Sequence, residues 1–240
     1  MSSEAGRRGT VREGPLRRWL LALDPANVRE RLSDTNDGIL TVAGTSLGLA
    51  GAEIDATTSY TVLAIAAAVG TLSTLSVQTS EEWNNYEAEQ DAIEHEQERI
   101  REDPESELNE LFEWFVAKGV TPGTAQRVAQ ELTDADALDV QLALEYGIED
   151  PLTRRQVVTR SFGAAGAFLL GAVLPIVLQM LAPLDFRSWL TMTIAGLSLT
   201  LTAIAYATRG HYRVLFAIVR GLVLGLGMLM LTYTLGDLLQ

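Results

Sequence analysis

Carboxylate side chains recur at helical spacing in one stretch of this 240-residue chain. Glu94 and Glu98 are four residues apart, and Glu107, Glu110 and Glu113 follow at intervals of three. On a helix these spacings place like charges about one turn apart on one face, where they repel one another. A divalent cation would neutralise them, and oxygen ligands suit Mg²⁺, Ca²⁺, Mn²⁺ and Fe²⁺. The alternative is a solvated acidic face without a ligand.

Asp37 is a second candidate, because it stands beside Gly38 at the start of an apolar segment. An ionisable side chain at the membrane entry of a span is costly and is therefore a functional candidate. Asp is also favoured as a helix N-cap, where its carboxylate accepts bonds from free backbone N–H groups. The residue type leaves both roles open. Glu30 and Asp34 precede Asp37 by seven and three residues and can share its helical face.

Several other kinds of chemistry are excluded by composition and motifs. The chain has no cysteine, which excludes thiolate metal sites, Fe–S clusters and cysteine nucleophiles. A ferritin-like centre needs Glu-x-x-His, and neither His95 nor His211 has a glutamate three residues earlier. The P-loop, Gly-x-Ser-x-Gly and His-Glu-x-x-His motifs are missing. We therefore expect neither an enzyme nor an organic cofactor.

The charge is segregated along the chain. The formal net charge is −13, and residues 81–113 hold 14 acidic and 2 basic residues. The remainder is nearly neutral and contains long apolar runs, which excludes both a simple soluble globule and a disordered acidic protein. A nucleic-acid partner is not expected, because no basic face could neutralise phosphates.

The apolar runs predict an all-α, polytopic membrane protein with five transmembrane helices, since a span needs about 20 residues. The first span is weak by hydropathy, but its glycines, including Gly48 and Gly51, suit close helix packing. An amphipathic helix at residues 16–32 is expected either on the membrane surface or as an ordinary capping helix. The predicted spans are residues 39–52 with a lead-in from about residue 32, 60–78, 161–182, 189–207, and 221–235 with a lead-in from 214.

The insert between the second and third spans has its own helical organisation. Residues 81–102 contain neither Gly nor Pro and predict a helix that can continue the second span. Asp103-Pro104 breaks it, with Pro favoured in the first turn of the next helix. Further helices are expected at residues 105–118, from 122 to about 132, and at 134–146 before Gly147. The predicted domains are residues 1–31, 32–78, 79–160 and 161–240, respectively an N-terminal segment, two spans, a metal-binding insert and three spans.

Orientation follows from the basic residues of the loops. The N-terminal segment has seven Arg, the loop between the first two spans has none, and residues 79–160 contain seven Arg and Lys. We expect the N-terminus and the insert in the cytoplasm and the C-terminus outside. The excess of Arg over Lys, with many acidic residues, suggests a prokaryotic cell membrane.

Three segments resemble the vacuolar iron transporter family. Asp37-Gly-Ile-Leu-Thr, followed by Gly48-Leu-Ala-Gly-Ala, is similar to the family's first membrane helix. The segment Pro104-Glu-Ser-Glu-Leu-Asn-Glu resembles its Pro-x-x-Glu-x-x-Glu motif. The segment Glu145-Tyr-Gly-Ile-Glu-Asp-Pro resembles its Glu-Leu-Gly-Leu-Glu-x-Pro motif. The resemblance covers about residues 28–238.

The resemblance implies a five-helix homodimer in the lipid bilayer that moves Fe²⁺ or Mn²⁺ out of the cytoplasm in exchange for protons. Zn²⁺ is a further candidate substrate. Asp37 would be the pathway carboxylate, with Glu30 nearer the cytoplasm. The implied metal ligands are Glu107, Glu110 and Glu145, with Glu96 and Glu98 as candidates on the preceding helix.

The chain also departs from the family. The pathway methionine of the second span falls at about Thr71, a methionine pair falls at Gln141 and Leu142, and Arg99 replaces a glutamate of the first insert helix. Thioether ligands help to select softer metals, so their loss bears on iron selectivity. The leading hypothesis is a divalent-metal/proton antiporter. The alternatives are a membrane-anchored metal sensor or buffer, which the missing methionines favour, and an interaction protein with a solvated acidic face.

Overall fold

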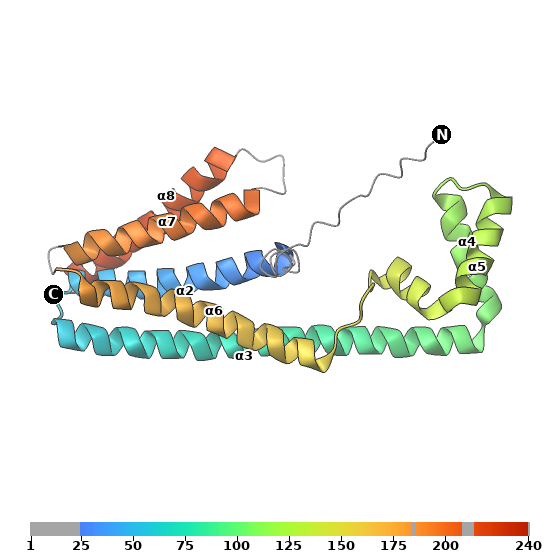
Figure 1. Cartoon of the computed structure of the whole chain (residues 1–240), viewed down its shortest axis with the longest axis horizontal. Helices are drawn as coiled ribbons and strands as arrows, with labels where there is room; N and C mark the ends of the chain where they lie inside the picture. The colour runs from blue at the N-terminus through green and yellow to red at the C-terminus, as the bar shows by residue number, and fades with distance from the viewer. Residues whose placement is uncertain (1–24, 184–185, 208–213, 240) are drawn as a thin grey trace, which may run out of the picture. The chain divides into compact units, whose positions relative to one another are not determined.

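The computed structural model describes residues 25–183, 186–207 and 214–239, and every regular element in these ranges is a helix. The prediction of an all-α chain is confirmed for this part. Most of the expected amphipathic helix at 16–32 lies outside the described residues, and so does His211. The helices are α2 (Pro25–Gly51), α3 (Ala56–Glu102), α4 (Pro104–Ala117), α5 (Pro122–Gln141), the π-helix η1 (Leu142–Tyr146), α6 (Arg154–Leu181), α7 (Arg187–Ala207) and α8 (Val214–Leu238) (Figure 1).

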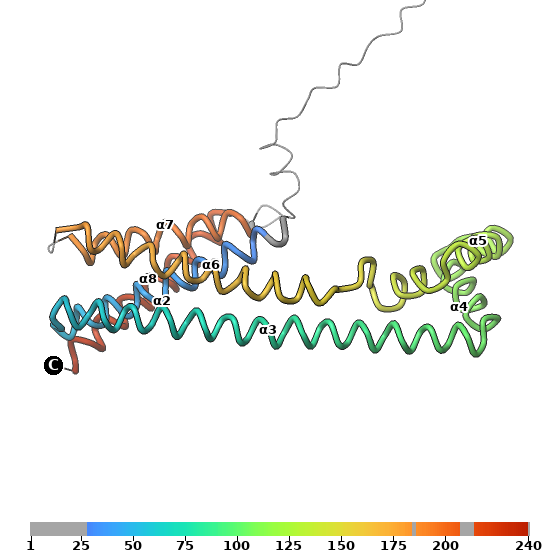
Figure 2. Tube along the Cα trace, turned by 60° about the horizontal axis from the view of Figure 1, so that its bottom comes forward, coloured from blue at the N-terminus to red at the C-terminus, as the bar shows by residue number. Residues whose placement is uncertain are grey.

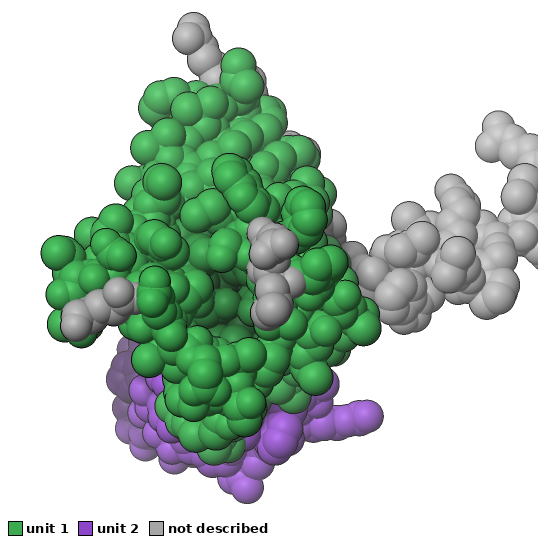
Figure 3. All heavy atoms as spheres, turned by 90° about the vertical axis from the view of Figure 1, so that its left-hand side faces the viewer, with its two compact units in different colours: residues 1–72, 164–240 green, residues 73–163 purple. Residues whose placement is uncertain are grey.

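The chain forms two compact units, coloured separately in Figure 3. Unit 1 consists of Met1–Leu72 and Ala164–Gln240, and unit 2 is Ser73–Gly163. Helices α3 and α6 each contribute residues to both units. The expected continuation of the second span into the acidic insert is observed, because α3 runs without a break to Glu102 (Figure 2).

Helix α2 is the central helix of unit 1, and two of its faces are buried. One face packs against α7 and α8, and the other packs against α3 and α6. The first core cluster consists of Ile39, Ala43, Leu47, Ala195 and Leu229. The second consists of Val42, Leu63, Ala67, Phe168 and Ala172. This burial fixes α2, which carries Asp37, among the apolar helices.

Glycines let the backbone of α2 approach two neighbouring helices closely. A Cβ atom at Gly38 would collide with the backbone of α6, and one at Gly171 of α6 would collide with the carbonyl oxygen of Thr35. At the other end of α2, a Cβ at Gly51 would collide with α8, and one at Gly236 of α8 would collide with α2. Such small-residue crossings are typical of packed membrane helices. The packing role expected for Gly51 is confirmed.

Within the part of the chain that the structure describes, four helices are long and apolar enough to cross a membrane, namely α3, α6, α7 and α8. They expose large apolar side chains such as Leu170, Leu215 and Leu231, as a lipid-facing surface requires. Helix α2 is not among the four, since charged residues recur through its first half. The protein is therefore an integral membrane protein.

Unit 2 contains α3 from Ser73 onward, followed by α4, α5 and η1. Oδ1 of Asp103 accepts a bond from the backbone N–H of Ser106 at 3.0 Å and caps α4, with Pro104 in the first turn. A break between two helical stretches is observed as predicted, but it lies at the non-helical residue Asp136 and not at residues 132–134. Shortly before Asp136, Thr133 donates its hydroxyl to the carbonyl oxygen of Ala129, a bond that often accompanies a bend in a helix.

Candidate metal centre

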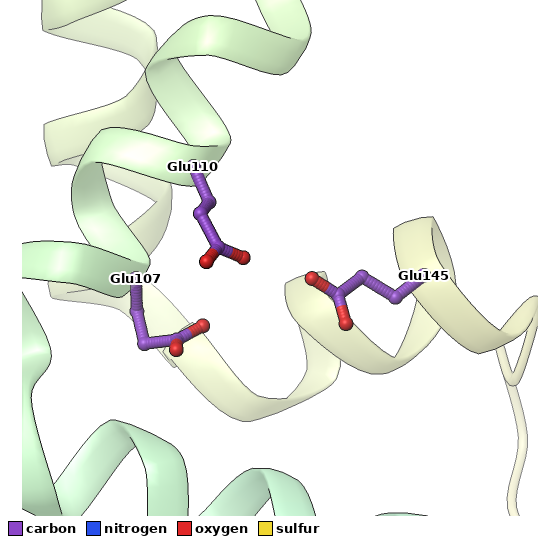
Figure 4. Close-up of side chains that lie close together, drawn as sticks. All are labelled: Glu107, Glu110 and Glu145. Atoms are coloured by element: carbon purple, nitrogen blue, oxygen red, sulfur yellow. The ribbon is translucent and has the colours of Figure 1, made fainter.

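Three glutamates of unit 2 converge on one point. Glu107 and Glu110 lie one turn apart on α4, and Glu145 lies on η1. One carboxylate oxygen from each lies within 4.8 Å of the other two, and the three side chains point into a common space (Figure 4). Oxygen atoms at this separation can bind one divalent cation, whose typical ligand distances are about 2.0–2.6 Å.

Local backbone geometry brings these side chains together. The Asp103 cap and Pro104 fix where α4 begins, and with it the position of Glu107 in the first turn. Glu145 belongs to a single π turn, a distortion that is frequent at functional sites. Gly147 ends that turn with a φ of +68°, a conformation that glycine adopts without steric cost.

The guanidinium of Arg99 on α3 lies among the same carboxylates. Nη2 is 2.9 Å from Oε1 of Glu107 and 2.7 Å from Oε2 of Glu110. Nη1 is 3.1 Å from Oε2 of Glu145 and 3.3 Å from Oε2 of Glu96. One cation therefore pairs with four carboxylates, which we call the Arg99 cluster.

Exposure rises from one side of the Arg99 cluster to the other. The side chain of Glu96 is 0% exposed and that of Glu107 is 7% exposed, whereas Glu145 and Glu110 are 33% and 47% exposed. Oε1 of Glu96 is buried and finds no hydrogen-bond partner among the described residues. The Arg99 cluster is thus closed at Glu96 and open to solvent at Glu110 and Glu145.

The two buried carboxyl groups of the Arg99 cluster have raised pKa values. Burial raises the pKa of Glu96 to about 7, against the opposing effect of the Arg99 charge and with the help of Glu107 and Glu145. Burial also raises the pKa of Glu107, again opposed by Arg99. Both shifts have the same physical cause, since a carboxylate removed from water and placed beside other carboxylates is stabilised in its neutral form.

Gln141 supports one ligand of the Arg99 cluster. Its buried Nε2 donates to the backbone oxygen of Glu107 at 3.1 Å and to Oε2 of the same residue at 3.3 Å. This is a position where the family resemblance predicted a methionine, and the neighbouring Leu142 is buried in the core. The side chain at position 141 therefore offers amide chemistry and no thioether.

The structure brings together four of the five predicted ligands, namely Glu96, Glu107, Glu110 and Glu145. Glu98 is exposed on α3 and makes no described contact with the Arg99 cluster. The central position of Arg99 was missed at the sequence level, where it was noted only as a replaced glutamate. Its three-residue spacing from Glu96 on one helix was the available signal.

The predicted pathway residues lie in unit 1. Asp37 and Glu30 are exposed on α2. Thr71 of α3 is half-buried and donates its hydroxyl to the carbonyl oxygen of Ala67 at 2.7 Å. Next to Asp37, the buried side chain of Asn36 accepts a bond from the hydroxyl of Ser198 at 2.8 Å.

Sequence reasoning also missed a buried polar network in unit 1. The amide of Gln179 accepts a bond from the hydroxyl of Ser46 at 2.9 Å and donates to Oγ1 of Thr191 at 2.8 Å. An amide inside an apolar run was the signal that could have identified it, because a buried polar group needs partners.

Comparison with known proteins assigns the chain to a family. The sequence model of the VIT family matches residues 28–237. The chain belongs to the VIT family. A vacuolar iron transporter of Acanthamoeba castellanii (strain ATCC 30010 / Neff) is 28% identical over 158 residues, which cover 61% of this chain and 59% of that relative. The match to the VIT family includes residues 28–51 of α2, among them Asp37, and every residue of the Arg99 cluster.

Proposed function

We propose that this protein exports a divalent metal ion, Fe²⁺ or Mn²⁺, from the cytoplasm in exchange for protons. The observation that carries the proposal is the convergence of Glu107, Glu110 and Glu145 in unit 2. Membership of the VIT family and the similarity to a protein named as a vacuolar iron transporter support it.

The chemistry of the proposed capture site favours hard cations. Its ligands are carboxylate oxygens, which suit Mn²⁺ and Fe²⁺ better than thiophilic metals. The amide of Gln141 stands where a thioether was expected, so discrimination in favour of softer ions is reduced. Mn²⁺ is therefore the first substrate to test, with Fe²⁺ next and Zn²⁺ as a further candidate.

Asp37 is the proposed carboxylate of the membrane pathway. Its side chain is exposed on the surface of unit 1, although α2 itself packs between apolar helices. A charge facing lipid is costly, whereas the same charge in a protein interface or a water-filled path is not. This supports a homodimer in which α2 is the fifth span and lies at the interface. Glu30 and Thr71 are proposed to line the same path.

The proposed orientation follows the distribution of basic residues. The N-terminus and unit 2 would face the cytoplasm of a prokaryotic cell and the C-terminus the outside. Metal captured in unit 2 would pass to Asp37, and protons from the outside would neutralise carboxylates and release it. Protonation lowers the affinity of a carboxylate for metal, which couples the two ions.

The second candidate function is a membrane-anchored metal sensor or buffer. Arg99 favours it, because a guanidinium among the ligands lets the Arg99 cluster fold without metal. The Arg99 cluster would then report metal by exchanging one cation for another, without transport through unit 1.

Transport into proteoliposomes separates the two functions. The purified full-length protein is reconstituted, and uptake of Mn²⁺ and Fe²⁺ is measured with and without an imposed pH gradient. Accumulation that depends on the gradient supports the antiporter. Binding of Mn²⁺ without accumulation of either metal supports the sensor or buffer. Protein-free liposomes and liposomes treated with a proton ionophore serve as controls.

A further inference from the structure

The nitrogen atoms of Arg99 use the same oxygens that a metal ion would need. Nη2 lies between Glu107 and Glu110, and Nη1 contacts Glu145. These three carboxylates are the ones whose oxygens converge within 4.8 Å. A metal ion bound to them would take over lone pairs that now accept from the guanidinium, so the two cations exclude each other.

The guanidinium satisfies the Arg99 cluster only in part. It supplies one positive charge to four carboxylates, two of which are almost completely buried. Oε1 of Glu96, on the same carboxylate whose Oε2 contacts Arg99, is buried without a partner among the described residues. A buried oxygen without a partner is costly, so the guanidinium leaves the Arg99 cluster incompletely satisfied.

A divalent ion is a stronger competitor than the guanidinium for this position. It carries twice the charge and approaches oxygen to about 2.0–2.6 Å, whereas the nitrogens of Arg99 remain at 2.7–3.3 Å. The guanidinium stays charged at every accessible pH, so it leaves only by moving. Its side chain is 28% exposed, and it lies beside the solvent-exposed Glu110 and Glu145.

We infer that Arg99 is an internal cation that holds the Arg99 cluster together without metal and that an incoming divalent ion must displace. The inference rests on the proposed function of the Arg99 cluster as a capture site. Because each binding event has to break the ion pairs of Arg99, the affinity for metal is lower than the three converging carboxylates would otherwise give. A site of this kind releases its ion readily, which suits transfer better than storage.

The test measures Mn²⁺ binding to full-length protein in detergent, by calorimetry and by the paramagnetic resonance signal of free Mn²⁺. Arg99→Ala should bind Mn²⁺ about tenfold more tightly than wild type, or more, because the competing charge and its hydrogen bonds are gone. Arg101→Ala is the matched control, since this exposed arginine lies two residues further along α3, and its affinity should equal that of wild type.

Guanidinium chloride at low millimolar concentration provides a second readout. In Arg99→Ala it should refill the vacated position, raise the thermal stability of the metal-free protein and weaken Mn²⁺ binding competitively. Sodium chloride at the same concentration should do neither. If Arg99→Ala does not fold, Arg99→Lys keeps the charge without the planar fork and should still bind Mn²⁺ more tightly than wild type.

The outcomes distinguish this inference from the proposed function. Unchanged or weaker Mn²⁺ binding in the Arg99 variants contradicts the displacement of Arg99 by metal but is compatible with the proposed capture site. If wild type and the Arg99 variants all fail to bind Mn²⁺, the Arg99 cluster is a structural ion-pair network. That result contradicts both the displacement of Arg99 and the proposed role of the cluster as a capture site.

Discussion

Nη2 of Arg99 lies 2.7 Å from Oε2 of Glu110, although the break at Asp103–Pro104 separates their helices. The same guanidinium reaches Glu145 on η1. Three segments of unit 2 are therefore joined through one side chain. The burial of such a network costs desolvation free energy, which is offset only when the hydrogen bonds of the network are well formed.

Glu110→Gln should lower the affinity for Mn²⁺ at least about tenfold, because the loss of a direct ligand costs no less than the loss of an outer-shell partner. Glu113→Gln is the matched control one turn along α4, where Oε1 of Glu113 accepts a bond from Asn109. Titration of full-length protein with Mn²⁺ measures both. Equal affinities for the two variants would remove Glu110 from the site.

The metal-free protein should lose stability as the pH rises from about 5 to 8. Glu96 has a pKa of about 7 in the folded state against 4.5 for the free side chain, because it is buried beside other carboxylates. Its contribution to the free energy of unfolding is therefore complete below pH 4.5 and disappears as the pH passes 7. The shift corresponds to a loss of up to about 3 kcal/mol.

Thermal unfolding in chelator, followed by tryptophan fluorescence, measures this effect, and two of the four tryptophans, Trp83 and Trp114, lie in unit 2. Glu96→Gln should flatten the dependence on pH and raise the melting temperature at pH 8. Glu98→Gln should keep the wild-type slope, since Glu98 is exposed on the same helix. A pH-independent melting temperature in wild type would contradict the assignment.

Asp37→Asn should abolish accumulation of Mn²⁺ in proteoliposomes while the full-length variant still binds Mn²⁺ in detergent. The amide keeps the size of the side chain but removes the charge that a cation needs along the path. Asp55→Asn is the control, because Oδ1 of Asp55 accepts bonds from the N–H groups of Thr57 and Thr58, and asparagine caps a helix equally well. Transport that survives in Asp37→Asn would exclude this carboxylate from the mechanism.

Gly171→Ala should reduce the yield of folded protein, because its Cβ would collide with the backbone of α2 at Thr35. Overpacking of this kind costs about 1–3 kcal/mol or more. Gly166→Ala lies on the same helix with open space around its Cβ, so it should be tolerated. Size-exclusion chromatography after heating in detergent compares them. Equal survival of both variants would mean that α6 and α2 can separate at this point without loss.

Much of the fold follows from local signals in the sequence. Asp103-Pro104 marks the start of α4, and the uninterrupted residues before it predict the continuation of α3. The expected break after residue 132 is placed slightly too early, since the non-helical backbone occurs at Asp136. Loop propensity alone does not determine at which of several polar residues the helical backbone is interrupted.

The candidate site was predictable only in part. Spacing and family resemblance named Glu107, Glu110 and Glu145, which lie on α4 and η1. The choice between Glu96 and Glu98 depends on which face of α3 meets α4, and this is a property of packing between helices. The position of Arg99 also needs tertiary structure, since its partners come from three segments.

The glycine crossings have a consequence for the proposed transport cycle. Helix α2 is in close backbone contact with α6 near Thr35 and with α8 near Gly48, so it is held at two points along its length. A helix held in this way cannot slide along its axis without breaking both crossings. Within unit 1, α2 is then the fixed helix, and in the proposed transport cycle access to Asp37 from alternate sides would have to come from helices that move around it.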